Sequence, residues 1–576
     1  MRFEEFCNYL VELEKTPKRL EMINILSEVF SKTNKEEINS TVNFVQEQLL
    51  PPFYNVQLGI ADKMAAKSVA LAYDKSPNKI LEEYKKIGDM GEVAEKECTI
   101  KQGADTSVKK VYDSLFEIAK ISGEGSVEQK IRALSDILKE CSALGARFIM
   151  RFVMGKLRLG VGEATIMEAL SKAKTGSREF KADIERAFNL CSDLGYVSDV
   201  LYSHGKEGIE RFKITAMKPI RPALAERVGS TEEIIQKLGK CAIDQKLDGF
   251  RAQVHKKGNE VKVFSRNLED ITHFMPEIVK EIQKMDFESI ILDGEALTYD
   301  ENTGTLYPFQ ITIQRKRKHN IEEVSQGLPL RLFVFDIMLL NGKSLINEPY
   351  VNRRAEIDKV FSNTKTITKT NMIITDKADE IDKFFDSVLE SGLEGIVAKR
   401  LGSPYSAGAR NFNWIKMKRS YNSQLTDTID LVILGYFKGR GHRANFGIGA
   451  VLAGVYDTKE DKFKSITKVG SGFSEEQFKE LYKILNDIKV DSKPARVDTI
   501  LQPDVWVIPK YVITVKADEI TRSPTHTAGM KDGIGYALRF PRAVSFIRAD
   551  KKAEDSNSVK DVLEMYEQQK NTKVKS

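Results

Sequence analysis

The spacing of the apolar residues changes near residue 217, and this change limits what the chain can fold into. Through roughly the first 200 residues, apolar side chains recur every three or four positions, as at Phe6, Leu10 and Leu13, which is typical of packed helices. After "MKPIRPALAERV" (217–228) the chain turns to short β-rich runs that alternate with helical segments. From about residue 426, short strands with glycine-rich turns predict a small barrel.

These changes predict a multidomain α and α+β protein. A chain of 576 residues is longer than one hydrophobic core usually organises. We expect an all-α region over 1–214, an α+β domain over 215–420, and an OB-fold β-barrel over 421–576 that ends in a helix. No internal repeat and no low-complexity block interrupts this order.

Composition permits several kinds of partner and excludes some classes of protein. Lys and Arg number 89 against 83 Asp and Glu, so the formal charge of +6 allows nucleic-acid binding without establishing it. The sequence has no apolar run of about 18 residues, so we expect no membrane span and a cytoplasmic location. Five scattered cysteines without a C-x-x-C pair argue against a zinc ribbon and a disulfide framework.

The stretch "AIDQKLDGFRA" (242–252) contains the candidate nucleophile, Lys246. A lysine amine is reactive only when burial or nearby positive charge lowers its pKa from about 10.4. Arg251 and Arg266 are candidates for that charge and for gripping phosphate oxygens. By itself K-x-D-G would arise by composition about 0.1 times in such a chain, so a surface turn is the better reading of this motif taken alone.

Other motifs strengthen the case. "LDGE" (292–295) is read as the end of an apolar strand bearing Asp293 and Glu295, and "EGIVAKR" (394–400) opens with Glu394. "WIKMKR" (414–419) places Lys416 and Lys418 on one side of a strand. Carboxylates and ammonium groups in such a set suit a nucleoside triphosphate and its Mg²⁺. Each motif also has a structural reading, as a turn, a strand start or a solvated edge.

In this order the motifs resemble those of the covalent nucleotidyltransferases, and most closely the ATP-dependent DNA ligases of the archaeal and eukaryotic replicative type. "KLDGFR", "SRN", "LDGE", "FVFDIMLLNG", "EGIVAKR" and "WIKMKR" carry the resemblance in the middle of the chain. "GKLRLGVGEATIMEAL" is similar to the family's helical DNA-binding domain, and "KVGSGFS" and "LRFPRAVSFIRADKK" to its OB domain. The resemblance therefore spans nearly the whole chain.

The resemblance implies a function and a set of residues. Lys246 would attack the α-phosphorus of ATP to form lysyl-AMP, AMP would pass to the 5′-phosphate at a nick, and the 3′-hydroxyl would displace it. The implied metal ligands for Mg²⁺ are Glu295 and Glu394, and Phe335 would stack on adenine. The implied nucleotide-binding residues are Asp244, Arg251, Arg266, Glu295, Phe335, Arg410, Lys416 and Lys418.

The expected substrate is nicked double-stranded DNA, sealed during replication, repair and recombination. The family also implies a sliding-clamp partner, although no clamp-binding box is found, and a nucleoid-associated monomer. In the final motif Arg539, Arg542, Arg548, Asp550 and Lys551 would help to orient pyrophosphate. Basic residues of 145–173 are read equally as a solvated helix face or a DNA contact, and "QRKRKHN" (314–320) equally as a solvated loop or a DNA contact.

Three departures and three alternatives stay open at this point. Asp244 stands where the family often has glutamate, Leu247 where tyrosine is usual, and Phe250 where glutamate is frequent. An RNA ligase or capping-type nucleotidyltransferase would share the Lys246 chemistry, but would not be expected to carry such a helical domain. A non-catalytic DNA clamp would form no covalent intermediate. NAD-dependent ligases carry a cysteine zinc module, which the scattered cysteines cannot build.

Overall fold

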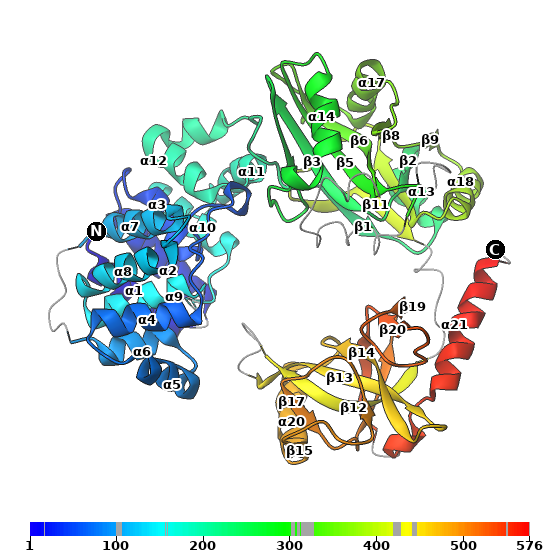
Figure 1. Ribbon diagram of the computed structural model, residues 1–576. Helices are drawn as coiled ribbons and strands as arrows, with labels where there is room; N and C mark the ends of the chain where they lie inside the picture. The colour runs from blue at the N-terminus through cyan, green and yellow to red at the C-terminus, as the bar shows by residue number, and fades with distance from the viewer. Residues whose placement is uncertain are drawn as a thin grey trace. The chain divides into compact units, whose positions relative to one another are not determined.

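The computed structural model describes residues 1–16, 18–99, 106–155, 157, 159–300, 306–307, 312, 328–418, 428–439, 446–548 and 551–574 (Figure 1). These residues form two compact units. One comprises Met1–Arg227 and Thr231–Lys416, and the other Val228–Ser230 and Met417–Ser576. None of the described helices is long and apolar enough to cross a membrane.

The N-terminal part of the first unit is all-α, as its periodicity predicts (Figure 1). A continuous core joins side chains from α1 to α12, including Phe6, Phe44 and Phe148, all without exposed surface. Its helices are α1 (Phe3–Lys15), α2 (Arg19–Lys32), α3 (Ile38–Val45), α4 (Asp62–Ala72), α5 (Pro77–Ile87), α6 (Met90–Glu97), α7 (Val108–Lys120), α8 (Ser126–Lys139), α9 (Ala143–Val153), α10 (Glu163–Thr175), α11 (Lys181–Cys191) and α12 (Leu194–Glu210).

The α+β part of the first unit is built on two sheets. One has the strand order β1-β11-β10-β2-β9, and the other β4-β3-β5-β6-β7 with β8 paired to β6. The strands are β1 (Leu224–Arg227), β2 (Cys241–Lys246), β3 (Phe250–Lys257), β4 (Glu260–Phe264), β5 (Ser289–Thr298), β6 (Leu330–Leu340), β7 (Lys343–Ser344), β8 (Ile367–Lys369), β9 (Met372–Thr375), β10 (Gly395–Arg400) and β11 (Arg410–Lys418). The helices α13 (Thr231–Leu238), α14 (Pro276–Lys284), α17 (Tyr350–Val360) and α18 (Ala378–Glu390) accompany them.

The second unit is β-rich, which confirms the prediction of a strand-rich region after about residue 426. Its main sheet includes the order β15-β17-β12-β13-β14-β16, with β18 paired to β12 and β21. The strands are β12 (Ile429–Lys438), β13 (Ile448–Asp457), β14 (Lys462–Val469), β15 (Lys489–Val490), β16 (Val497–Asp498), β17 (Val505–Val507), β18 (Val512–Lys516), β19 (Glu519–Ser523), β20 (Gly535–Arg539) and β21 (Arg542–Ile547). Helix α20 (Glu475–Asn486) begins with a capping box at Ser474, and α21 (Val559–Val574) is the expected C-terminal helix.

The segment 217–223 is hydrogen-bonded to alternate side chains of β3. Met217 N donates to Nδ1 of His255 at 3.1 Å, and the Gln253 amide exchanges two hydrogen bonds with the backbone of Ile220, at 2.7 and 2.9 Å. Two residues before Gln253 on the same strand, Arg251 donates to the carbonyl of Ala223 at 2.9 Å. Residues two apart on a strand share a face, so β3 acts as a continuous attachment for the segment.

His255 should make the first unit sensitive to acid. Burial lowers the pKa of His255 to about 3, whereas an unfolded chain would titrate near its ordinary value of 6.5. The folded pKa is depressed, so the stabilisation is complete above pH 6.5 and is lost as the pH falls toward the folded pKa. We expect His255→Gln to reduce the pH slope of the unfolding free energy between pH 4 and 6 by about 1.4 kcal/mol per unit. Chemical denaturation of the first unit at several pH values measures this slope.

The exposed His204 supplies the control for that experiment. His204→Gln should leave the slope unchanged, because the side chain is exposed and its replacement disturbs no buried contact. Equal slopes for wild type and His255→Gln would contradict the assignment of a neutral, buried imidazole.

Candidate functional site

Lys246 lies close to the carboxylates of two motifs, Glu295 of "LDGE" and Glu394 of "EGIVAKR". It is the last residue of β2, which pairs antiparallel with β10 so that Lys246 is opposite Gly395. The amide of Glu394 donates to the Lys246 carbonyl at 3.0 Å, and this pairing brings the Glu394 carboxylate into an ion pair with Lys246 Nζ. The same ammonium is 3.3 Å from the carbonyl of Leu247. Strand pairing across 148 residues of sequence therefore joins two predicted site residues.

The surroundings of Lys246 favour the reactive amine. Burial lowers the pKa of Lys246, Arg266 and Arg251 act in the same direction, and Glu295 and Asp248 oppose them. β2 ends at Lys246, so Asp248 is in the connection between β2 and β3. A lysine with a lowered pKa is partly deprotonated closer to neutral pH and can attack an electrophilic phosphorus.

Glycine at 249 allows the close packing beside the nucleophile. A Cβ atom at this position would be 2.5 Å from the Ala296 carbonyl oxygen and 2.7 Å from the Leu297 side chain. The Gly249 amide in turn donates to Glu295 Oε1 at 3.2 Å. The glycine of K-x-D-G thus brings the backbone after Lys246 against β5, within reach of Glu295.

Glu295 is within β5, and not at a strand end. The structure corrects the reading of "LDGE" as a terminus, because β5 continues to Thr298 and pairs with both β3 and β6. Burial raises the pKa of Glu295 to about 7, while Lys246 and Arg251 counteract this effect. A carboxyl that titrates near neutral pH beside a half-buried lysine is characteristic of a reaction site.

Glu295 and Glu394 are the two carboxylates near Lys246 that could hold a magnesium ion together with a substrate phosphate. Both carboxylates adjoin Lys246, and Mg²⁺ is usually held by one or two carboxylates together with phosphate oxygens and water. Among the residues that the structure describes, no cluster of three or more His, Cys, Asp or Glu could hold a metal by itself. When bound, the ion would neutralise phosphate charge.

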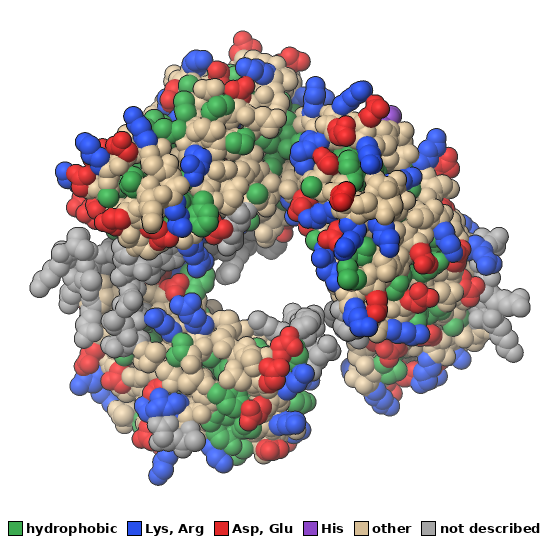
Figure 2. Space-filling model, turned by 180° about the vertical axis from the view of Figure 1, so that it is seen from behind, with side chains coloured by type: hydrophobic (Ala, Val, Ile, Leu, Met, Phe, Trp, Pro, Cys, Tyr) green, Lys and Arg blue, Asp and Glu red, His purple; other side chains and the backbone are tan. Residues whose placement is uncertain are grey.

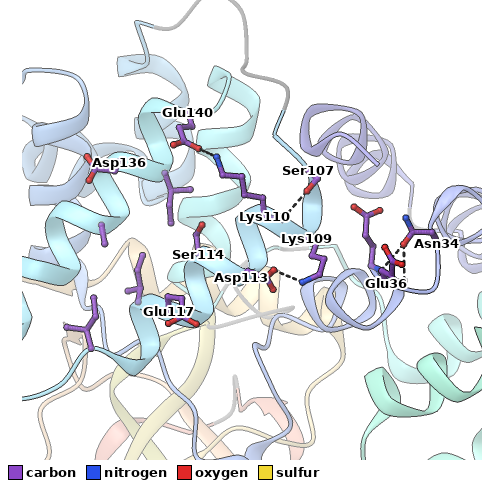
Figure 3. A pocket seen from close by; sticks show the side chains of 15 residues that line it. Asn34, Glu36, Ser107, Lys109, Lys110, Asp113, Ser114, Glu117, Asp136 and Glu140 are labelled. Carbon is purple, nitrogen blue, oxygen red and sulfur yellow. Dashed lines mark hydrogen bonds and ion pairs between the residues drawn. The ribbon is translucent and has the colours of Figure 1, made fainter. Parts of the chain in front are cut away.

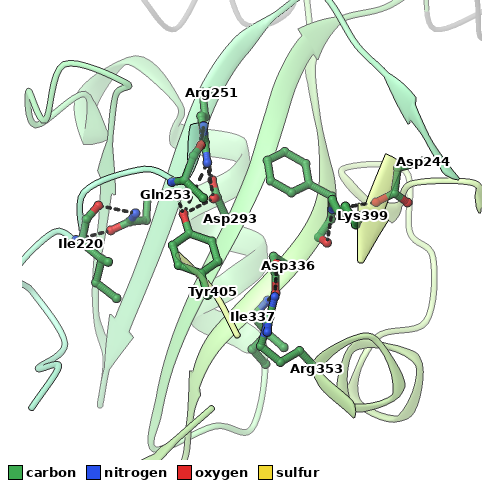
Figure 4. A network of polar contacts seen from close by, with 12 residues as sticks. Ile220, Asp244, Arg251, Gln253, Asp293, Asp336, Ile337, Arg353, Lys399 and Tyr405 are labelled. Atoms are coloured by element: carbon green, nitrogen blue, oxygen red, sulfur yellow. Dashed lines mark hydrogen bonds and ion pairs between the residues drawn. The ribbon is translucent and has the colours of Figure 1, made fainter. Parts of the chain in front are cut away.

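Arg251 belongs to a buried polar cluster (Figure 4). Its guanidinium makes two hydrogen bonds to Asp293, at 3.0 and 2.7 Å, and Tyr405 donates to the same carboxylate at 2.7 Å. Burial alone would lower the pKa of Arg251, but Asp293 raises it above the ordinary value. The guanidinium also approaches the rings of Phe335 and Trp414, at 5.7 and 5.9 Å from their centroids. Arg251 therefore remains charged and is held rigidly beside the candidate stacking residue.

The remaining predicted residues occupy varied positions. Arg266 is exposed in the turn after β4, where Ser265 N donates to the Glu269 carbonyl at 2.9 Å. Lys416 is opposite Arg227 on β11, and Lys418 ends that strand. The backbone of Arg410 is opposite Leu224 on β1, while its side chain lies outside the described residues.

Leu247 and Phe250 have packing roles that explain two departures from the family pattern. Leu247 is 4% exposed and packs with Leu297 and Phe333. The ring of Phe250 meets that of Phe274 edge-on, with centroids 5.3 Å apart. Both residues contribute to the folding of the α+β domain.

Two basic residues of the segment 145–173 are involved in internal ion pairs. Arg151, predicted as a solvated or DNA-contacting residue, is 3% exposed and pairs with Asp89 and Glu14, while Arg147 pairs with Glu14 at 2.8 Å. Both readings are wrong for Arg151, because a buried guanidinium needs carboxylate partners within the fold. Lys156, Arg158 and the "QRKRKHN" segment lie outside the described residues.

In the final motif, two basic residues are bound to β12 of their own unit. Arg548 is 3.6 Å and Lys551 2.5 Å from the Asp430 carboxylate. Arg539 pairs with Glu519 at 3.1 Å, and Arg542 is exposed. Asp550 lies outside the described residues.

A cavity of about 810 Å³ in the helical part is separate from the Lys246 site (Figure 3). The rim carries charged pairs, Lys109 with Asp113 at 2.5 Å and Lys110 with Glu140 at 2.6 Å. Over the face that Figure 2 shows, Lys and Arg are likewise interspersed with Asp and Glu. Charge distribution alone therefore does not locate the site, which rests on the contacts of Lys246.

Four residues outside the predicted set take part in the polar contacts around the site: Asp293, Tyr350, Lys399 and Tyr405. Asp293 and Lys399 are within the motifs "LDGE" and "EGIVAKR". The sequence therefore marks these two positions but does not indicate what their side chains contact. Tyr350 and Tyr405 have no local signal, because their partners are 106 and 112 residues away in sequence.

Three family models match the chain. They are described as DNA ligase N terminus, over residues 2–171, ATP dependent DNA ligase domain, over 222–418, and ATP dependent DNA ligase C terminal region, over 444–551. The chain is 49% identical to a "Probable DNA ligase" of Dictyoglomus turgidum, covering 100% of this chain and 99% of that protein. It is 40% identical to a "DNA ligase" of Nitrosopumilus maritimus, with 99% and 98% covered.

A solved structure shows the same overall fold. It is described as "Pmar-Lig_PreS3" and matches with a TM-score of 0.56 over 94% of this chain and 98% of the other, at 19% sequence identity.

Proposed function

The chain belongs to the ATP-dependent DNA ligase family, and on that premise we propose that it seals nicks in double-stranded DNA through a lysyl-AMP at Lys246. The observation that carries the proposal is the half-buried Lys246 beside Glu394 and Glu295, on an α+β domain that follows a helical region and precedes a β-rich region along the chain. The family match to the N-terminal region favours DNA over the RNA ligase and capping alternatives.

The proposed reaction has three steps. The neutral amine of Lys246 attacks the α-phosphorus of ATP, a P–N bond forms, and the bond to pyrophosphate breaks. The 5′-phosphate at the nick then attacks the same phosphorus and releases the lysine. Finally the 3′-hydroxyl attacks the adenylated 5′-phosphate, which forms the phosphodiester and releases AMP.

The side chains around Lys246 have distinct proposed roles. Arg251 and Arg266 contact the nucleotide and the nick phosphate, and Lys416, Lys418 and Arg410 add further phosphate or nucleotide contacts. Phe335 stacks on adenine, which its partly buried ring between Arg251 and Trp414 supports. Asp244 contributes to nucleotide binding from β2. Glu295 and Glu394 hold Mg²⁺.

The wider setting is also a proposal. We place the domain boundaries near residues 214 and 420, with the helical domain binding DNA and the α+β domain carrying adenylation. The protein acts as a nucleoid-associated cytoplasmic monomer in replication, repair and recombination, with a sliding clamp as a partner.

Labelling with nucleotide tests the proposal directly. With ATP labelled at the α-phosphate and Mg²⁺, the denatured protein should retain about one label per active chain, because the P–N bond is covalent. The same protein should then seal a nicked DNA duplex faster than a matched nicked RNA duplex.

ATP labelled at the γ-phosphate is the control, since that phosphate leaves with pyrophosphate. Absence of protein-bound α-label, alongside an active reference ligase, would point to a non-catalytic DNA-binding protein. Sealing of the RNA substrate alone would point to an RNA ligase.

A further inference from the structure

Lys399 is a buried cation on the strand that pairs with β2, which ends at Lys246. It is on β10 and is 1% exposed. Its ammonium is 2.6 Å from Asp244 Oδ2 and donates to the Phe335 carbonyl at 3.1 Å. The rings of Trp414, Tyr350 and Phe335 surround it, with centroids 4.5, 4.6 and 4.8 Å from Nζ. A lysine is seldom buried so completely, and here a carboxylate and three aromatic faces replace water.

The Asp244 carboxylate is engaged by protein groups on both oxygens. Besides Lys399, Oδ2 accepts the hydroxyl of Tyr350 at 2.8 Å, and Oδ1 accepts the hydroxyl of Thr370 at 3.2 Å. The side chain is 2% exposed. Asp244 is two residues before Lys246 on β2, yet its hydrogen bonds are made within the protein (Figure 4).

The bond from Lys399 to Phe335 joins the two sheets of the α+β domain. Lys399 belongs to the sheet of β2, β10 and β11, whereas Phe335 is on β6 of the other sheet. Trp414 on β11 completes the junction, because its ring meets that of Phe335 edge-on at 6.0 Å. The position of the Phe335 ring relative to Lys246 therefore depends on the buried ammonium.

We propose that Lys399 is a positioning residue for the nucleobase of ATP, which fixes the ring of Phe335 and holds the Asp244 carboxylate inward. Asp244 then acts through Lys399, and does not read the amino group of adenine. This inference rests on the proposed function, because it takes Phe335 as the ring on which the base stacks. It accounts for the aspartate at 244, whose short side chain meets Lys399 across the paired strands β2 and β10.

The test measures self-adenylylation by full-length Lys399→Met against ATP concentration. We expect the half-saturating ATP concentration to rise at least about tenfold, with the rate at saturation within about threefold of wild type. Sealing of a nick that already carries the 5′-adenylate should stay within about threefold, because AMP then arrives covalently attached. Lys399→Arg, which keeps the charge and donors, should restore much of the ATP affinity.

Lys256 provides a matched control. It is 3% exposed in the same domain and donates to the carbonyls of Gln283, at 3.3 Å, and Met285. Lys256→Met should lower the unfolding free energy but leave the half-saturating ATP concentration unchanged. An equal rise in both methionine variants, or loss of sealing of the adenylated nick by Lys399→Met, would show a merely structural role and overturn the proposal.

Purine riboside triphosphate, which lacks the 6-amino group, separates the two roles of Asp244. If Asp244 acts through Lys399, Asp244→Asn raises the half-saturating concentrations of ATP and of the analogue by the same factor. A change in their ratio would mean that the carboxylate reads the amino group, contrary to the proposal. If wild type is not labelled by ATP at all, the proposed function fails instead, so the two failures are distinct.

Discussion

Lys246→Ala is expected to abolish self-adenylylation and nick sealing from ATP, by on the order of 1,000-fold or more. The substitution removes the nucleophilic amine, which the strand pairing of β2 with β10 places beside Glu394. A nick that already carries the 5′-adenylate bypasses the lysine, so the variant should still seal it. Single-turnover labelling with ATP and sealing of the adenylated nick measure the two outcomes separately.

Lys240 is a suitable control, since it is an exposed lysine immediately before β2. Lys240→Ala should keep both activities. A Lys246→Ala protein that still acquires α-label would refute the assignment of the nucleophile. Loss of sealing on the adenylated nick as well would show that the substitution disrupts the site beyond the first step.

Asp293→Ala should destabilise the first unit and disable adenylylation together. Asp293 has no exposed side-chain surface and makes a two-point pair with Arg251, while Tyr405 donates to the same carboxylate. Removing the carboxylate leaves a buried guanidinium without its counter-charge, which typically costs about 3–5 kcal/mol. Arg251 would shift toward other acceptors, so the adenylylation rate should fall by roughly 100-fold even where the protein stays folded.

Chemical denaturation and single-turnover labelling measure these two effects. Asp293→Asn keeps the shape and part of the hydrogen bonding, so it should lie between wild type and the alanine variant. Asp386→Ala, at an exposed position on α18, should change neither quantity. Wild-type stability in Asp293→Ala would show that Arg251 does not need this partner.

Sequence periodicity predicted the class of each region because it records local geometry. The 3.6-residue repeat of the first 200 residues reflects one buried face per helix, and the short alternating runs reflect strands. Strand ends are less well defined in the sequence: "LDGE" predicts a terminus, yet β5 continues to Thr298 because Gly294 allows close approach to β6. A Cβ at Gly294 would be 2.8 Å from the Phe333 carbonyl oxygen, which only the paired strand reveals.

The order of the motifs predicted which segments form the site, but not the partners of each side chain. The resemblance implies roles for both Lys246 and Glu394, and strand pairing brings them into contact. The pairs of Asp293 with Tyr405 and Asp244 with Tyr350 join residues more than 100 positions apart. A local sequence pattern cannot predict such a pair, because each residue taken alone looks like an ordinary core or strand residue.

The attachment of residues 217–223 along β3 also bears on how this protein could be recombined with its relatives. A chimaera joined at residue 214 would import a foreign helical domain but keep the native segment with the Gln253 and His255 side chains that receive it. A junction placed between Met217 and Ala223 would instead divide one set of contacts between two parents. The natural point of exchange is therefore before the segment, so that segment and β3 are inherited as a single block.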